Sequence, residues 1–300
     1  MVRTTRRGLL QAVGAAAGLG AAGTLAACAP VPGGPTPSGA TGGASAPPAT
    51  NSPTAATTTP AASADLRLVT ASDGHLGEPG TDSRRFLEEL VDAVNTLHAT
   101  APVDIAVLNG DIGHGGAALL REAKKGLDRL EMPYLVTQGN HDEVSAADWE
   151  DIWGAPGDQV HRLGRRSLVL ANTSNEAGDY LCADQDWLAQ ALSGEAVQQD
   201  VLVFMHITPN TWTKWGIACP GVRRVLAGAP NVRAAFNGHD HDQGGVKVDE
   251  GVHYFFDAHY GGHWGTSYRA FRLVELGDGR LSTRLVTTAG ERRAGDDLRW

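Results

Sequence analysis

Five short polar segments of this sequence combine histidine, aspartate and asparagine in a way that suits metal binding. Each segment directly follows an apolar run, and together they contain Asp73, His75, Asp111, Asn140, His141, Asp142, His206, His239 and His241. Imidazole nitrogen and carboxylate oxygen suit ions such as Zn, Fe or Mn, and no thiolate belongs to the set. Two such ions about 3.5–4 Å apart stabilise both the attacking and the leaving oxygen of an in-line displacement at phosphorus. The set therefore predicts a binuclear metal centre.

The apolar runs before these segments predict the strands that must position them. They are residues 66–72, 103–108, 133–138, 201–206 and 232–236. Helical patterns at 83–100 and 115–130 lie between the first three runs, with Ser83 as the expected N-cap of the first helix. This alternation predicts parallel βαβ units, in which ligands collect at the carboxyl ends of the strands. We therefore expect an α/β fold in which the five segments meet.

The remainder of the chain has weaker patterns. Residues 184–194 read as a short amphipathic helix. The runs 246–248, 252–258, 268–276 and 281–288 look like consecutive antiparallel strands. A single domain covering residues 65–300 is the simplest organisation that holds all these elements.

The ordered set D-x-H, G-D, G-N-H-D, H and G-H-x-H resembles the calcineurin-like metallophosphoesterase superfamily over residues 65 to about 260. The resemblance implies a four-layer α/β/β/α sandwich of two mixed sheets with the site at strand carboxyl ends. It also implies a hydroxide shared by two metals as the nucleophile. The implied ligands of the first metal are Asp73, His75 and His241, with Asp111 bridging, and those of the second are Asn140, His206 and His239.

Further roles follow from the same resemblance. His141 would contact the phosphate oxygens or protonate the leaving group, and Asp142 would orient its imidazole. His114, Trp212, Tyr260 and His263 are candidates for contact with the substrate. Trp215 and Trp264 lie beside them, and all these aromatic residues could instead pack against the core.

Within the superfamily, the short chain and its motifs look most like the bacterial phosphodiesterase branch. His114 stands where the purple acid phosphatase branch places a tyrosine ligand, which argues against that branch. The block Met205-His206-Ile207-Thr208-Pro209 also departs from the His-His-Pro-Pro run common among the phosphodiesterases. Because the short chain and its other motifs still look most like the phosphodiesterase branch, we expect phosphodiester hydrolysis. A phosphomonoesterase that scavenges phosphate and a non-catalytic metal-binding lipoprotein are the alternatives.

Residues 1–28 have the layout of an export signal, with a basic start, an apolar stretch and small residues before Cys28. Arg6 and Arg7 resemble the twin-arginine motif, and residues 25–28 resemble a lipobox that would lead to lipidation of Cys28. An uncleaved anchor and a plain cleavable signal are the alternatives. Residues 29–64 are almost entirely Ala, Pro, Gly, Ser and Thr and predict a disordered tether. We expect the protein on the outer face of the cytoplasmic membrane, in contact with the membrane only through lipid.

The charge balance is acidic, with a net charge of −9. Removing residues 1–28 takes away three of the 25 basic residues and none of the 34 acidic ones, which gives −12. This charge argues against a nucleic-acid partner, because such binding relies on Lys and Arg neutralising phosphates. We expect a small phosphate ester as the substrate. Cys182 and Cys219 would form a disulfide in an exported protein, or else remain two buried thiols.

Overall fold

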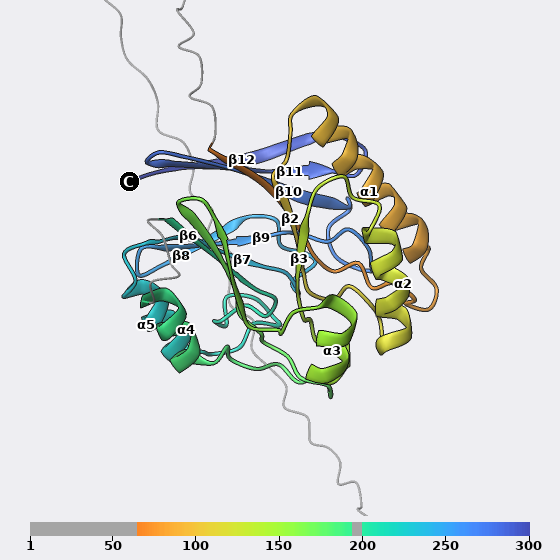
Figure 1. Ribbon diagram of the computed structural model, residues 1–300, viewed down its shortest axis with the longest axis horizontal. Coiled ribbons are helices and arrows are strands. Elements are labelled where there is room, and N and C mark those ends of the chain that lie inside the picture. Colours follow the sequence, from red (N-terminus) through yellow and green to blue (C-terminus); the bar gives the residue numbers. More distant parts are fainter. Residues whose placement is uncertain (1–64, 194–199) are drawn as a thin grey trace, which may run out of the picture. The chain divides into compact units, whose positions relative to one another are not determined.

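The computed structural model describes residues 65–193 and 200–300, which form two six-stranded sheets packed face to face (Figure 1). The predictions of a signal and a tether fall on residues 1–64 and therefore lie outside the described residues. Within the described part, no helix is both long and apolar enough to cross a membrane.

The first sheet has the strand order β12-β11-β10-β1-β2-β3. Its strands are β1 (Leu66–Ala71), β2 (Ile105–Asn109), β3 (Tyr134–Thr137), β10 (Ala270–Gly277), β11 (Arg280–Thr287) and β12 (Arg292–Arg299). β1, β2 and β3 run parallel, joined by α1 (Ser83–Thr100) and α2 (Ala117–Leu127), which confirms the predicted βαβ units. Helix α3 (Ala146–Trp153) follows β3. The site segments 73–75, 111 and 140–142 thus leave three neighbouring strands in the same direction.

The second sheet has the order β4-β5-β6-β7-β9-β8. Its strands are β4 (Gln159–Leu163), β5 (Arg166–Leu170), β6 (Asp200–Met205), β7 (Val232–Asn237), β8 (Val246–Asp249) and β9 (Val252–Phe256). β5, β6, β7 and β9 are parallel, and α4 (Gln185–Ser193) and α5 (Pro220–Ala227) accompany them. The expectation of consecutive antiparallel strands is wrong at one point, because β9 pairs parallel with β7 and β10 joins the other sheet.

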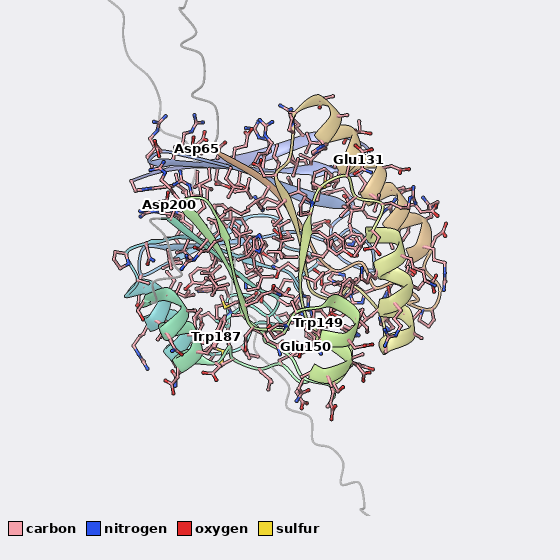
Figure 2. The ribbon with its side chains drawn as sticks, viewed as in Figure 1. Asp65, Glu131, Trp149, Glu150, Trp187 and Asp200 are labelled. Carbon is pink, nitrogen blue, oxygen red and sulfur yellow. A yellow bond between two sulfur atoms is a disulfide. The ribbon has the colours of Figure 1, made fainter. Side chains whose placement is uncertain are left out.

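Three apolar clusters separate four layers of structure. Alternate residues of each central strand face opposite ways, so Leu68 packs between the sheets while Val69 packs toward α1 and α2. In the second sheet, Phe204 faces the space between the sheets and Val203 faces α4 and α5. Side chains fill the space between the sheets (Figure 2). The expected four-layer α/β/β/α sandwich is confirmed.

One local prediction fails at the start of α1. The N-cap is Asp82, without a side-chain capping bond, and Ser83 is the first helical residue. The Ser83 hydroxyl instead accepts a hydrogen bond from the backbone N–H of Gly77. It therefore ties the helix start to the loop that follows β1, which carries Asp73 and His75.

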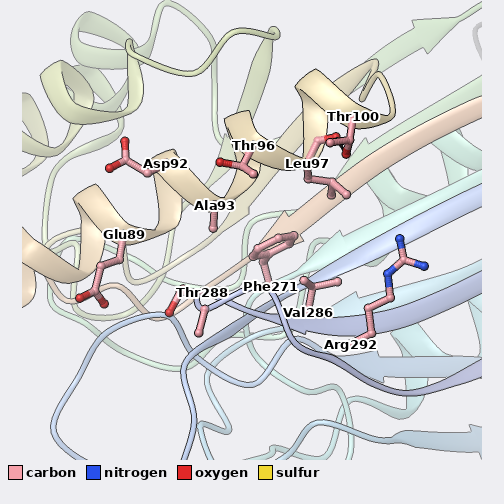
Figure 3. A pocket seen from close by; sticks show the side chains of 12 residues that line it. Glu89, Asp92, Ala93, Thr96, Leu97, Thr100, Phe271, Val286, Thr288 and Arg292 are labelled. Atoms are coloured by element: carbon pink, nitrogen blue, oxygen red, sulfur yellow. Dashed lines mark hydrogen bonds between the residues drawn. The ribbon is translucent and has the colours of Figure 1, made fainter.

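A groove of about 470 Å³ lies between α1 and strands β10 to β12 (Figure 3). Phe271 and Val286 form part of its apolar lining, while Glu89 and Arg292 contribute charge. None of the site residues predicted from the sequence lines it. The polar segments predicted from the sequence therefore lie outside this groove.

Candidate active site

The structure brings the five polar segments together at the carboxyl ends of β1, β2, β3, β6 and β7. Three groups of side chains have ligand atoms within 4.8 Å of one another, namely Asp73, His75, Asp111 and His241; Asp111, His206 and His239; and His75, His114 and His141. Asp111 belongs to the first two groups, and His75 belongs to the first and the third. Oδ2 of Asp111 lies 3.5 Å from His75 Nε2 and 3.2 Å from His206 Nε2. One carboxylate therefore faces both halves of the site.

The backbone at the candidate ligands is unusual. Asp73, His75, Asp111 and His239 all have positive φ angles, between 46° and 66°. Non-glycine residues rarely adopt this conformation, and it is retained mainly where the surrounding structure and the function require it. A Cβ on Gly139 would lie 2.1 Å from the backbone nitrogen of Asp111, so glycine is required at that crossing of two loops.

Two of the histidines have their ring orientation fixed by backbone carbonyls. Nδ1 of His206 lies 2.7 Å from the carbonyl oxygen of Asn109, and Nδ1 of His241 lies 3.2 Å from that of Trp264. Donation of the Nδ1 hydrogen to a carbonyl leaves Nε2 with a free lone pair, as metal-binding histidines require. In both residues, Nε2 is the nitrogen that faces the carboxylates.

Among the described residues, the buried atoms Asn140 Oδ1 and His239 Nε2 have no hydrogen-bond partner, and His206 Nε2 faces the Asp111 carboxylate at 3.2 Å. A buried polar atom without a partner costs about 1–3 kcal/mol. These three atoms belong to the residues expected to hold the second metal. The donor set of oxygen and imidazole nitrogen therefore fits a divalent metal ion.

The electrostatics favour ionised carboxylates and, at two positions, neutral imidazoles. Burial opposes ionisation of Asp73, but His241 and His206 outweigh it and lower its pKa to about 2. Burial also opposes ionisation of Asp111, and His206 and His75 hold its pKa well below the usual range. Burial lowers the pKa of His75 to about 3 and that of His239 to about 4. These are the protonation states that metal ligands need.

Asp142 has a different position from the one expected. Its oxygens accept hydrogen bonds from the backbone N–H groups of Gly113, at 2.8 Å, and Gly139, at 2.7 Å. Burial and the nearby Asp111 raise its pKa to about 7. Asp142 thus ties the loop after β2 to the loop after β3, and these hydrogen bonds of its carboxylate go to the backbone and not to the His141 imidazole.

The four residues predicted to contact substrate separate into two pairs. His114 reaches the site, with Nδ1 3.2 Å from Nδ1 of His75, and His263 lies exposed at its edge, paired with Glu78. Tyr260 is buried beneath Gly74, so the prediction that it contacts substrate is wrong. Trp212 packs against Tyr254 in the core beside α5.

Other residues near the site were missed or left undecided. The exposed ring of Tyr180 stands edge-on to His239, with centroids 4.5 Å apart. Trp264 stacks on His241 at 4.3 Å, and Trp215 lies 6.3 Å from Trp264. Cys182, two residues after Tyr180, forms a disulfide with Cys219, which confirms that pairing. The nearby Cys182 was the sequence feature that could have predicted a fixed position for the Tyr180 loop.

A buried histidine near the site also went unpredicted. His259 stacks on His241, the same ring that stacks on Trp264, and the centroids of the two histidine rings are 5.2 Å apart. Its two nitrogens contact the carbonyl oxygens of Gly261 and Thr266. His259 therefore holds the loop after β9 against His241 rather than facing a ligand. Its sequence position, three residues beyond a strand, did not distinguish it from the metal-binding candidates.

Comparison with known proteins agrees with this geometry. The model of the calcineurin-like phosphoesterase family matches residues 66–243, more than half of the chain. No curated protein matches the sequence. A dimetal phosphatase from Danio rerio is similar in structure, with 14% identity, a TM-score of 0.61, and coverage of 79% of this chain and 99% of that one. GAP50, described as the anchor in the inner membrane complex of Plasmodium, has 13% identity, a TM-score of 0.55, and coverage of 78% and 88%. At such identities the two structures show the fold alone.

Proposed function

The chain belongs to the calcineurin-like phosphoesterase family of metal-dependent phosphate-ester hydrolases, and we propose that it hydrolyses phosphodiesters with two metal ions. The observation that carries the number of ions is the pair of ligand groups that share Asp111. The first ion would be held by Asp73, His75, Asp111 and His241, and the second by Asp111, Asn140, His206 and His239. Oxygen and imidazole donors restrict the metals to Mn, Fe, Zn or similar ions.

When bound, a pair of such ions supplies Lewis-acid activation of water and of the phosphate ester. The chain itself supplies position and proton transfer. His141 is partly exposed beside the buried ligands, and its backbone N–H donates to Asp111 Oδ1 at 2.8 Å. Its imidazole is thus placed to contact the phosphate oxygens and to give a proton to the departing oxygen.

The charges around the site favour a diester over a monoester. Among the described residues, the basic groups within 4.0 Å of the Asp73 and Asp111 carboxylates are the imidazoles of His75, His206 and His241. A monoester carries a charge of about −1.5 to −2 at pH 7 and is bound best by guanidinium groups in a fork geometry. A diester carries a single negative charge, so it depends less on cations beyond the metals.

The aromatic residues of the site also suit a substrate with two organic groups. Tyr180 contacts His239, whereas Trp264 contacts His241 and lies beside Trp215. The two aromatic groups therefore flank different ligands and come from different loops. Phosphodiesters have a substituent on each side of phosphorus, whereas monoesters have only one.

The test is a comparison of bis-p-nitrophenyl phosphate with p-nitrophenyl phosphate, with Mn, Zn and Fe added in turn. We expect a higher kcat/KM for the diester and two metal ions per chain by elemental analysis. A preference for the monoester would contradict the proposed specificity. Survival of all phosphatase activity in both Asp111→Asn and His141→Ala would contradict the catalytic assignment itself.

We also propose that the protein is a lipoprotein on the outer face of the cytoplasmic membrane. The twin-arginine and lipobox residues of the sequence support this location, and so does the disulfide, because disulfides persist in oxidising compartments. The variant Cys28→Ser should be recovered in the soluble fraction, while the unchanged protein sediments with membranes. Equal distribution of the two proteins would contradict lipid anchoring.

A further inference from the structure

His75 differs from the two histidines whose rings are held by backbone carbonyls. Its Nε2 faces the centre of the site, 3.0 Å from His241 Nε2 and 3.5 Å from Asp111 Oδ2. Its other nitrogen, Nδ1, lies 3.2 Å from Nδ1 of His114. The partner that fixes the tautomer of His75 is therefore another imidazole.

Only one hydrogen can lie between two Nδ1 atoms. If His75 carries it, His114 accepts it, and His75 Nε2 keeps the free lone pair that a metal requires. If His114 carries it, His75 has its hydrogen on Nε2, and that nitrogen can no longer act as a ligand. An acceptor at the position of His114 Nδ1 thus favours the tautomer in which His75 binds metal.

The ring of His114 has a second contact. It stacks on the imidazole of His141, with centroids 4.8 Å apart and an angle of 13° between the planes. The carboxylate expected to orient His141, that of Asp142, is bonded to backbone N–H groups instead. The His75 ring meets the edge of His141 with centroids also 4.8 Å apart, so His114 is the side chain that stacks on the His141 ring and is placed to orient its plane.

The backbone around His114 shows that both contacts are built into the fold. Its own N–H donates to the carbonyl of Leu76, the residue after His75, at 3.0 Å. The N–H of Gly115 donates to the carbonyl of His141 at 2.8 Å. The segment 113–115 therefore bridges the loops that carry the two histidines.

We propose that His114 is a positioning residue with two separable roles. Its Nδ1 accepts the hydrogen of His75 Nδ1 and so makes His75 a metal ligand, and its ring orients His141 for proton transfer. The first role rests on the proposed function only in taking His75 as a ligand. His114 itself needs to touch neither the metal nor the substrate.

Three substitutions separate the roles. His114→Asn places an amide oxygen near the position of imidazole Nδ1 and so keeps an acceptor, but it removes the ring. His114→Leu has nearly the shape of asparagine and has neither the acceptor nor the ring. His114→Phe keeps a ring for His141 and lacks the acceptor. Because His114 is only partly buried, all three side chains can be accommodated, and thermal unfolding checks that each variant folds.

The first measurement is the affinity for Mn²⁺, determined by titrating metal-free protein with the ion. We expect His114→Asn to bind the ions about as the unchanged protein does, and Leu and Phe variants to lose about 10–100-fold in affinity at one site. The second measurement is kcat at saturating metal with an alkyl and an aryl leaving group. We expect the Phe variant to retain a higher kcat than the Asn and Leu variants, which lose most with the alkyl group because that group needs the proton.

Several outcomes would overturn this proposal. Equal metal affinity of the Asn and Leu variants would refute the role of the acceptor, and equal kcat of the Phe and Leu variants would refute the role of the ring. Three bound ions, with one lost in every variant, would show that His75, His114 and His141 bind an ion themselves. Failure of the proposed function looks different, because the unchanged protein would then bind no metal pair or hydrolyse no phosphate ester.

Discussion

Replacing Gly139 by alanine should separate the two loops that meet at Asp111. The new Cβ would lie 2.1 Å from the backbone nitrogen of Asp111 and 2.2 Å from its Oδ1, whereas real contacts of this kind essentially never fall below 3.0 Å. The loops must therefore move apart by about 1 Å. No flexible side chain can absorb this shift, because the atoms that collide belong to the backbone and to a short, bonded carboxylate.

The expected losses follow from this displacement. Overpacking of a tight interior costs about 1–3 kcal/mol of unfolding free energy, or roughly 2–12 °C in Tm for a domain of this size. A misplacement of about 1 Å in a catalytic site lowers kcat/KM on the order of 100-fold. The metal content should fall as well, because Asp111 faces both ligand groups.

The assay compares kcat/KM for bis-p-nitrophenyl phosphate, the bound metal and Tm in Gly139→Ala and in a matched control. Gly245→Ala is that control, because a Cβ there meets nothing within 4 Å and the backbone needs no positive φ. We expect the control to be unchanged in all three measurements. Full activity and full metal content in Gly139→Ala would refute the view that this close approach shapes the site.

Three further predictions concern metal, disulfide and packing. Removal of metal by a chelator should lower Tm and abolish activity, since an ion at 100 times its Kd stabilises by about 2.7 kcal/mol, and Mn²⁺ should restore both; an unchanged Tm would contradict metal binding. Reduction of the Cys182–Cys219 disulfide, whose residues are 37 apart in sequence, should lower the free energy of unfolding by about 3–4 kcal/mol, as measured by scanning calorimetry. It should also raise KM in kinetic assays, because the Tyr180 loop is then held less firmly. Tyr260→Phe should leave kcat unchanged, because the ring is buried and does not face the substrate. Tyr260→Ala should lower the free energy of unfolding by about 3–5 kcal/mol, as measured by chemical denaturation. A lower kcat in the Phe variant would show that the Tyr260 hydroxyl takes part in the reaction.

The sequence alone was sufficient for the parts of the fold that local patterns control. The apolar runs at 66–72, 103–108 and 201–206 correspond to β1, β2 and β6, because buried strands need continuous apolar side chains. Parallel strands place their carboxyl ends at one edge, so the polar segments of each sheet were expected to lie together. The packing of the two sheets then brings the segment after β6 to those after β1 and β2. The five segments therefore lie close together, although Asp142 bonds the backbone of two loops instead of the His141 imidazole.

Tertiary structure decided the roles that depend on contacts between distant segments. Which sheet β9 and β10 join depends on pairing partners far along the chain, and a short apolar run carries no such information. The bonds of Asp142 to Gly113 and Gly139, and the position of His114 between His75 and His141, exist only once three loops are packed together. Residue type predicts which groups can bind a metal, but only the packed loops determine which nitrogen faces which partner.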